Sequence, residues 1–168
     1  VLVRRGLADP ADARAFLASD GPLDPPEAIP GIPEAADRLA QAVRRNERIV
    51  VHGDYDCDGI CSTAILVQAL RARGATVRSF LPSRFTDGYG VSVATVERLA
   101  DEGCDVLVTV DCGTTAVDSL TRAAELGMES IVCDHHLAGG VRPPGIIANP
   151  ALGRGSDALP AAAGVTFK

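Results

Sequence analysis

The sequence has 168 residues, of which 46% are hydrophobic and 23% charged, so it can form an ordinary folded domain rather than a disordered chain. Its formal net charge of -6 argues against a protein that simply coats nucleic acid, because such proteins are usually basic. Aromatic residues make up 4%, with no Trp, which argues against an aromatic-lined groove within this segment.

The first 32 residues are rich in Pro and Gly and predict a loosely structured lead-in, with a short helix around residues 12–17. A helix with an apolar stripe is expected to begin near Pro33. Residues 48–52, RIVVH, predict a short buried strand. An acidic loop, GDYDCDG, follows this strand and leads into a helix over residues 60–73.

Strands and helices alternate along the rest of the chain, with Gly at several helix ends. The expected strands cover 76–81, 105–111, 130–134 and 145–149, and the expected helices cover 92–101, 115–126 and a stretch from about 159. This alternation predicts an α/β fold with a Rossmann-like parallel sheet and helices on both faces. In such sheets ligands bind at the carboxyl ends of the strands, so the site is expected there.

All three histidines of the chain stand at expected strand ends, beside aspartates. His52 ends the first strand, Asp111 ends the third, and Asp134, His135 and His136 follow the fourth. Because parallel strands end at one edge of a sheet, we expect these three segments to converge. Mixed Asp and His ligands suit Mn²⁺, Zn²⁺ or Fe²⁺ better than Ca²⁺. More than four candidate ligands indicates two ions roughly 3.5–4 Å apart, with Asp111 as the natural bridge.

Each of these segments also has a simpler interpretation. Asp54, Asp56 and Asp58 occupy alternate positions, which share one face of an extended segment and repel one another unless a cation lies between them. They could instead form a solvated acidic turn in which Asp58 caps the next helix. Asp111 could likewise be only a helix cap, while the residues after it present donors to a phosphate.

The five cysteines are odd in number and include no CxxC pair. This pattern indicates neither a disulfide framework nor a structural zinc site, so reduced thiols are expected. We find no signal peptide and no apolar run long enough to span a bilayer. A cytoplasmic protein with no membrane contact is the resulting expectation.

The ordered motifs resemble those of the DHH phosphoesterase superfamily. An HxxxDxD motif begins at His52, DCGT begins at Asp111, and DHH covers residues 134–136. Two further stretches, DYDCDGICST at 54–63 and PSRFTDGYGVS at 82–92, are similar to segments of RecJ-like exonucleases, as is the closing GVTFK. The superfamily also includes oligoribonucleases, cyclic-dinucleotide phosphodiesterases and manganese pyrophosphatases.

The resemblance implies a metal centre with two ions in the full-length enzyme. His52 and Asp56 would bind one ion, and Asp58 and His135 would bind the other. Asp111 would bridge the two ions and count as a catalytic residue. The implied ions are Mn²⁺, with Mg²⁺ as the alternative.

The same resemblance assigns roles around the metals. His136 would contact the scissile phosphate or support the metal ligands, and Asp134 would orient its neighbours, both as catalytic residues. Asp54 would orient ligands without binding an ion itself. Arg84 could bind backbone phosphate or be an ordinary surface Arg, and Tyr89 could stack on a base or only support packing.

The implied activity is metal-dependent phosphodiester hydrolysis by a RecJ-like, single-stranded-DNA-specific 5′–3′ exonuclease of DNA repair and recombination. The implied partners are single-stranded DNA, a single-strand-binding protein and recombination factors. The catalytic domain would cover residues 33–168, after a lead-in of residues 1–32, and would be truncated at its C-terminal side. The family's fourth-motif Asp would lie beyond this chain, which leaves the second metal short of one carboxylate.

Three alternatives remain open from the sequence. The chain could belong to a DHH oligoribonuclease or cyclic-dinucleotide phosphodiesterase, which the segment at 82–92 disfavours. It could be a DHH-derived binding module without catalysis, although loss of motif acids would mark that case. A Rossmann nucleotide-binding domain is the third alternative, and it is disfavoured because no GxGxxG follows the first strand.

Overall fold

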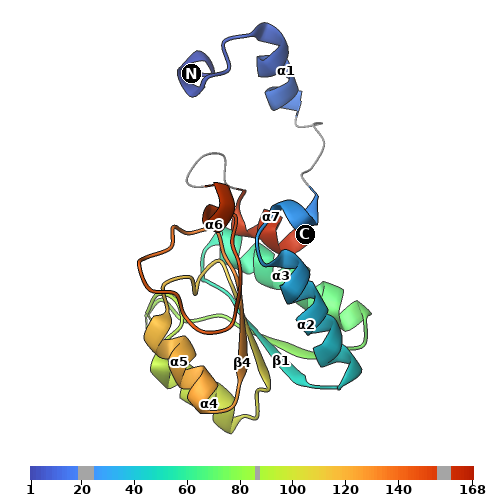
Figure 1. Ribbon diagram of the computed structural model, residues 1–168, viewed down its shortest axis with the longest axis vertical. Coiled ribbons are helices and arrows are strands. Elements are labelled where there is room, and N and C mark those ends of the chain that lie inside the picture. Colours follow the sequence, from blue (N-terminus) through green and yellow to red (C-terminus); the bar gives the residue numbers. More distant parts are fainter. Residues whose placement is uncertain (19–24, 86–87, 155–159) are drawn as a thin grey trace.

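The structure is a computed structural model that describes residues 1–18, 25–85, 88–154 and 160–168. Its centre is one parallel sheet of five strands in the order β2-β1-β3-β4-β5 (Figure 1). The strands are β1 (Arg48–His52), β2 (Thr76–Phe80), β3 (Val106–Val110), β4 (Glu129–Cys133) and β5 (Ile146–Ala148). The α/β fold and the parallel sheet predicted from the sequence are therefore confirmed.

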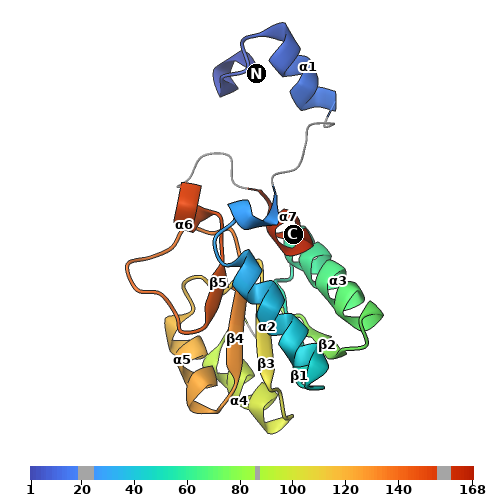
Figure 2. The ribbon, with the colours of Figure 1, turned by 45° about the vertical axis from the view of Figure 1, so that its right-hand side comes forward.

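Helices cover both faces of this sheet, as Figure 2 shows. On one face lie α2 (Ile32–Arg44), α3 (Cys57–Ala72) and α7 (Ala162–Phe167), and on the other lie α4 (Val93–Asp101) and α5 (Val117–Glu125). The shorter elements are η1 (Val3–Arg5), α1 (Pro10–Ala18), η2 (Pro26–Ala28) and α6 (Ala151–Arg154). None of the described helices is both long and apolar enough to cross a membrane.

The strands supply two separate cores because successive side chains point to opposite faces of the sheet. In β3, Val106, Val108 and Val110 pack toward α2 and α3, whereas Leu107 packs toward α4 and α5. Every residue of β3 is buried, as expected for the central strand of a sheet that is covered on both faces. This packing fixes where each strand ends along the strand direction, and hence the positions of the polar residues that follow it.

The connectivity of the sheet creates a switch point. The chain passes from β1 outward to β2, then returns to the other side of β1 to form β3, β4 and β5. At such a point the connections leave adjacent strands in opposite directions and open a crevice at the carboxyl ends. His52 at the end of β1 and Asp111 just after β3 border this crevice.

One helix begins earlier than the sequence pattern predicts. The expected helix over 60–73 is α3, which begins at Cys57, because Asp56 rather than Asp58 is its N-cap. The Oδ1 atom of Asp56 accepts a hydrogen bond from the Gly59 N–H at 3.0 Å. Asp58 therefore lies in the first helical turn, so the expected extended alternation of carboxylates ends at Asp56. The predicted start of the last helix near residue 159 lies outside the described residues.

An ion pair joins α2 to the start of β4. Arg38 is 8% exposed and donates from Nε to Glu129 Oε2 at 2.8 Å, and from Nη2 to Glu129 Oε1 at 3.0 Å. Its Nη1 lies 2.7 Å from Glu47 Oε2. Hydrogen bonds from Arg38, and then its charge, lower the pKa of Glu129. This pair ties the helix to the amino end of the sheet, opposite the predicted metal centre.

Replacing Glu129 with Gln should therefore make stability less sensitive to acid. The pKa of Glu129 is lower in the folded protein, so its contribution is present above the unfolded pKa and is lost as pH falls through the folded pKa. Because this carboxylate is largely exposed, we expect a loss of only about 0.5–1 kcal/mol at neutral pH. Urea unfolding of both proteins between roughly pH 6 and pH 3 measures the effect. Equal losses of unfolding free energy in the original protein and in Glu129→Gln on acidification would contradict this prediction.

Candidate metal centre

The acidic loop after β1 is held tightly against α3 by two glycines. A Cβ on Gly59 would lie 2.6 Å from the backbone N and O of Asp54, and one on Gly53 would lie 2.0 Å from Thr63 Oγ1. Only glycine permits this close approach. The hydrogen bond from Gly59, followed by smaller contributions, lowers the pKa of Asp56 and keeps this carboxylate ionised at neutral pH. The loop therefore presents a fixed negative charge at the crevice.

Asp111 is the most strained and most electrostatically perturbed acid in this region. Its φ of 60° lies in the left-handed region, which costs energy for a residue other than Gly. The residue is 2% exposed. Burial first, and then the charges of Asp58 and Asp56, raise the pKa of Asp111 to about 7. A cation placed among these three carboxylates would relieve the repulsion that they exert on one another.

The ligand atoms around Asp111 form two groups within the described residues. Oxygens of Asp54, Asp56 and Asp111 all lie within 4.8 Å of one another, and Asp111 is shared with a second group. The members of that second group are Asp111, Asp134, His135 and His136. Acid side chains from the loop after β1, the end of β3 and the end of β4 thus meet around one carboxylate, as the sequence predicts.

Asp134 organises the DHH segment through its own hydrogen bonds. Its Oδ1 accepts from the N–H of His135 at 2.7 Å, the N–H of His136 at 3.2 Å and the His136 ring Nδ1 at 2.7 Å. Its Oδ2 accepts from the Thr114 N–H at 3.0 Å. Burial alone would raise the pKa of Asp134, but the bonds from Thr114 and His136 outweigh it and lower that pKa. The carboxylate is 1% exposed and both of its oxygens accept hydrogen bonds, so it orients the histidines.

His135 presents a ring nitrogen to the acids. Its Nδ1 lies 3.1 Å from the carbonyl oxygen of Pro160, which can only accept, so the hydrogen of the neutral ring is on Nδ1. Its Nε2 lies 3.3 Å from Asp111 Oδ1 and 3.8 Å from Asp58 Oδ2. The Nε2 lone pair therefore faces two carboxylate oxygens. A divalent cation between them would make this arrangement attractive, so the donor set fits such an ion.

Two of the predicted metal ligands have other contacts and belong to neither ligand group. Asp58 accepts hydrogen bonds from the backbone N–H groups of Ala162 and Ala163, both at 2.8 Å, and so caps the start of α7. His52 is fully buried; its ring centroid lies 5.0 Å from that of Phe80, and its Nδ1 lies 3.9 Å from the Cys112 sulfur. An oxygen of Asp54, which is predicted to orient ligands without binding an ion, lies within 4.8 Å of oxygens of Asp56 and Asp111.

Arg84 and Tyr89 come together around a third residue, which the sequence reasoning missed. The Arg84 guanidinium carbon lies 4.7 Å from the Tyr55 ring centroid, and the rings of Tyr55 and Tyr89 meet edge to face at 6.4 Å. Desolvation, followed by the nearby charges of Asp54 and other acids, raises the pKa of Tyr89 to about 12. The signal for Tyr55 was its position between two aspartates of the acidic loop, which places its ring beside them.

A second missed residue connects the motifs. Asn149 is fully buried, and its Nδ2 donates to Thr114 Oγ1 and to the His136 carbonyl oxygen, each at 2.9 Å. Its Oδ1 accepts from the Ala151 N–H at 2.8 Å. The side chain thus joins the segment after β3 to the DHH segment after β4. The signal in the sequence was a polar residue at the end of the fifth expected strand, GIIAN.

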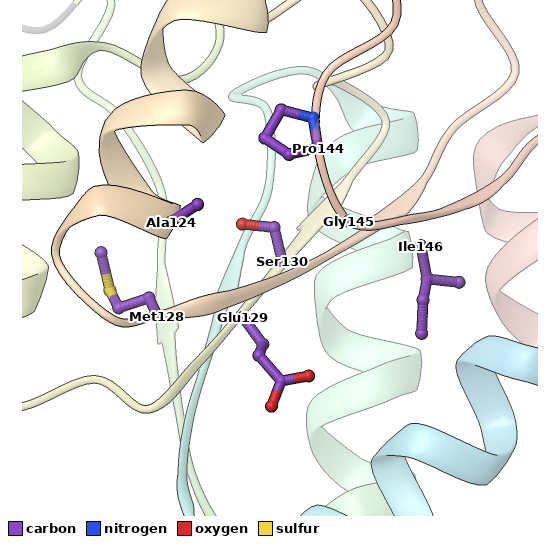
Figure 3. A pocket seen from close by; sticks show the side chains of 7 residues that line it. All are labelled: Ala124, Met128, Glu129, Ser130, Pro144, Gly145 and Ile146. Carbon is purple, nitrogen blue, oxygen red and sulfur yellow. The ribbon is translucent and has the colours of Figure 1, made fainter.

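A pocket at the opposite edge of the sheet contains none of these residues. It has a volume of about 170 Å³ and lies where β4 and β5 begin (Figure 3). Its lining comprises Ala124, Met128, Glu129, Ser130, Pro144, Gly145 and Ile146. The Glu129 carboxylate is bonded to Arg38, and the other lining side chains are apolar except for the Ser130 hydroxyl. Among the described residues, the two groups of side chains that could hold a metal lie instead at the carboxyl edge.

Comparison with known proteins identifies the family. The model of the DHH family, N-terminal domain, matches residues 48–168. This chain belongs to the DHH family. The matched range contains every motif of the metal centre, from His52 to His136. The family resemblance predicted from the motifs is thereby confirmed.

Several similar proteins are named as RecJ exonucleases. The chain is 48% identical, over 149 residues, to the single-stranded-DNA-specific exonuclease RecJ of Thermus thermophilus; the match covers 86% of this chain and 22% of that protein. A crystal structure of exonuclease RecJ bound to manganese superimposes with a TM-score of 0.79 at 45% identity, covering 87% of this chain and 37% of that chain. RecJ from Thermus thermophilus in complex with Mg²⁺ gives a TM-score of 0.58 at 34% identity, over 99% and 19% of the two chains. This chain thus spans about a fifth of the length of the curated relative.

Proposed function

We propose that this chain is the metal-binding part of a single-stranded-DNA-specific exonuclease of the RecJ type, a metal-dependent phosphodiester hydrolase. The observation that carries the proposal is the grouping of motif carboxylates and histidines around Asp111 in a chain of the DHH family. The identity of 48% to a RecJ exonuclease supports this choice over other DHH activities. The 5′–3′ direction of cleavage follows from the family resemblance.

The residues proposed to hold two divalent cations are His52, Asp56, Asp58, Asp111 and His135. The raised pKa of Asp111 and the orientation of the His135 Nε2 toward carboxylates support this set. Mn²⁺ is the proposed ion, with Mg²⁺ as the alternative, because RecJ structures with each were matched. Such ions, when bound, activate water as a nucleophile and shield the charge of a phosphate.

The protein groups around the metals would position the DNA strand. The His136 Nδ1 is bonded to Asp134, so its Nε2 is directed away from that carboxylate and could contact the scissile phosphate. Arg84 would bind a backbone phosphate, since its guanidinium is exposed above the Tyr55 ring. Tyr89, which is 62% exposed, would stack on a base.

The remaining assignments follow the same proposal. Residues 33–168 would form the N-terminal side of the catalytic domain, preceded by the lead-in of residues 1–32. The enzyme would act in the cytoplasm in DNA repair and recombination. A single-strand-binding protein and recombination factors are the proposed protein partners.

The test is a substrate panel for the complete gene product in Mn²⁺. We expect mononucleotides to be released from the 5′ end of single-stranded DNA, and duplex DNA of the same sequence to be resistant. The panel also holds a short oligoribonucleotide and a cyclic dinucleotide, because other DHH enzymes cleave these. If only the oligoribonucleotide and the cyclic dinucleotide were hydrolysed, the proposal would be wrong and the protein would be a different DHH phosphodiesterase. Absence of hydrolysis with Mn²⁺ bound would indicate a binding module.

A further inference from the structure

Tyr55 is the one aromatic residue of the acidic loop after β1. Its backbone N–H donates to Asp54 Oδ1 at 2.7 Å, and the residue after it, Asp56, caps α3. Tyr55 itself belongs to neither group of possible metal ligands. Its half-buried ring instead contacts Arg84 and Tyr89, which lie in the connection between β2 and α4. The backbone of Tyr55 is thus part of the acidic loop, whereas its side chain is directed to another segment.

Arg84 lies over an aromatic ring rather than beside a carboxylate. Several other arginines of the fold form ion pairs with carboxylates, among them Arg38, Arg48, Arg78 and Arg122. Among the residues that the structure describes, Arg84 forms no such pair, and its guanidinium carbon lies 4.7 Å from the centre of the Tyr55 ring. A cation–π contact uses the face of the ring and no carboxylate. The N–H groups of Arg84 therefore remain available for a phosphate, which a guanidinium can bind through two of them.

We propose that Tyr55 is a positioning residue that holds the Arg84 guanidinium in place to bind a phosphate of single-stranded DNA. The identity of this ligand rests on the proposed nuclease function. An exposed Arg side chain samples many rotamers, and restricting it on binding costs free energy. Contact with the Tyr55 ring restricts Arg84 before the DNA arrives, so this cost is smaller. Arg84 would therefore bind a phosphate more tightly with the ring than without it.

The place of Tyr55 in the chain explains why its ring would matter for a phosphate. Asp54 and Asp56 are its direct neighbours, and their oxygens belong to one group of possible metal ligands. Without cations these acids repel a phosphate, so a positive side chain beside them favours entry of the DNA strand. The ring of Tyr89 meets that of Tyr55 edge to face at 6.4 Å and braces it against rotation. The Tyr55 ring therefore sets how far the charge of Arg84 lies from the acids.

Titration of a 3′-labelled single-stranded oligodeoxynucleotide with the complete gene product, followed by fluorescence anisotropy, tests this role. A chelator is present, so that the oligonucleotide is not hydrolysed. We expect Tyr55→Leu to weaken binding by about 2–5-fold, the size of an exposed cation–π contact. Tyr55→Phe keeps the face of the ring and should bind as tightly as the unmodified protein. Arg84→Ala should weaken binding further and reduce the slope of log affinity against log salt by about 0.7, the loss of one phosphate contact.

Three further measurements separate positioning from other roles of the ring. Tyr55→Leu combined with Arg84→Ala should bind no more weakly than Arg84→Ala alone, because the ring acts through the cation. Arg122→Ala removes an exposed cation from α5 and is the matched control, which should retain the affinity of the unmodified protein. Mn²⁺ titration of Tyr55→Leu should give an unchanged affinity, which verifies that the acidic loop is intact.

Three results would overturn the inference. One is a Tyr55→Leu variant that binds as tightly as the unmodified protein, and another is an unmodified protein that does not bind the oligonucleotide. The third is a double variant that shows the sum of the two single losses, since the ring would then contact DNA itself or support the acidic loop.

The proposed nuclease function is judged separately, by hydrolysis in Mn²⁺. A protein that shows the expected binding pattern but hydrolyses no single-stranded DNA would uphold the role of Tyr55 and refute the nuclease function. Hydrolysis of single-stranded DNA together with equal binding by all variants would refute the role of Tyr55 and leave the nuclease function standing.

Discussion

Replacing Asp111 with Asn should abolish the Mn²⁺-dependent nuclease activity of the complete gene product while leaving its metal-free fold at least as stable as before. Asn retains the shape of the side chain and tolerates the left-handed conformation seen at φ 60°, so backbone strain is not altered. The activity should fall by more than about 100-fold, since residues that merely support metal ligands often contribute 10–100-fold.

The effect on stability has the opposite sign because the carboxylate is unfavourable without a cation. Burial and the charges of Asp58 and Asp56 raise the pKa of Asp111 to about 7, so ionising it above that pH costs free energy. Removing the charge should therefore stabilise the chelator-treated protein at about pH 8, by up to about 4 kcal/mol, because each pKa unit corresponds to roughly 1.4 kcal/mol. Mn²⁺ should raise the Tm of the unmodified protein but not that of the variant.

Urea unfolding with a chelator, thermal unfolding with and without Mn²⁺, and a nuclease assay together measure these effects. The matched control is Asp118→Asn, which alters an exposed carboxylate in the first turn of α5 and should change none of the three. A metal-free variant that is less stable than the original, together with an intact response to Mn²⁺, would refute the role assigned to Asp111. Both proteins are purified by the same procedure, because a contaminating nuclease would then appear equally in the two preparations.

Replacing Asp134 with Asn should weaken both the fold and the activity. The carboxylate accepts from His135, His136 and Thr114, and an amide must place its NH₂ group against one of these donors. We expect a loss of about 1–3 kcal/mol in the free energy of unfolding, the usual result of leaving a buried donor unpaired. The Mn²⁺ affinity or the activity should fall by about 10–100-fold, because His135 and His136 would lose their orientation.

Urea unfolding and Mn²⁺ titration measure the two effects of Asp134→Asn separately. Thr114→Val serves as a comparison, because it removes a hydroxyl that bonds Asn149 and also interacts with Asp134, but it keeps the backbone N–H that bonds Asp134. We expect that variant to lose stability with a smaller loss of Mn²⁺ affinity. Normal Mn²⁺ affinity in Asp134→Asn would show that the carboxylate does not orient the histidines for metal binding.

Much of the fold could be predicted because local and global signals agree. The apolar runs of β1 and β3 are too short for helices and are buried on both faces, and Gly at the helix ends marks the turns. In a parallel sheet this pattern brings the ends of β1, β3 and β4 together without further information. The convergence of Asp111 with the DHH segment follows from topology alone.

The details that could not be predicted depend on contacts between distant parts of the chain. Asp56 and Asp58 are both able to cap α3, and the sequence alone does not choose between them. The choice follows from α7, whose N–H groups engage Asp58 from more than 100 residues away. The buried link through Asn149 likewise depends on how β5 packs beside β4, which no local pattern encodes.

Anomalous diffraction at the manganese edge, from crystals of the protein soaked in MnCl₂, tests the metal centre most directly. We predict a peak at the carboxyl ends of β1, β3 and β4, with Asp111 among the ligands and the Nε2 of His135 directed toward the metal. Crystals of the Asp111→Asn variant, soaked in the same way, should show this peak weakened or lost. A peak elsewhere, or none beside Asp111 at saturating Mn²⁺, would contradict the assignment of this cluster as the metal centre.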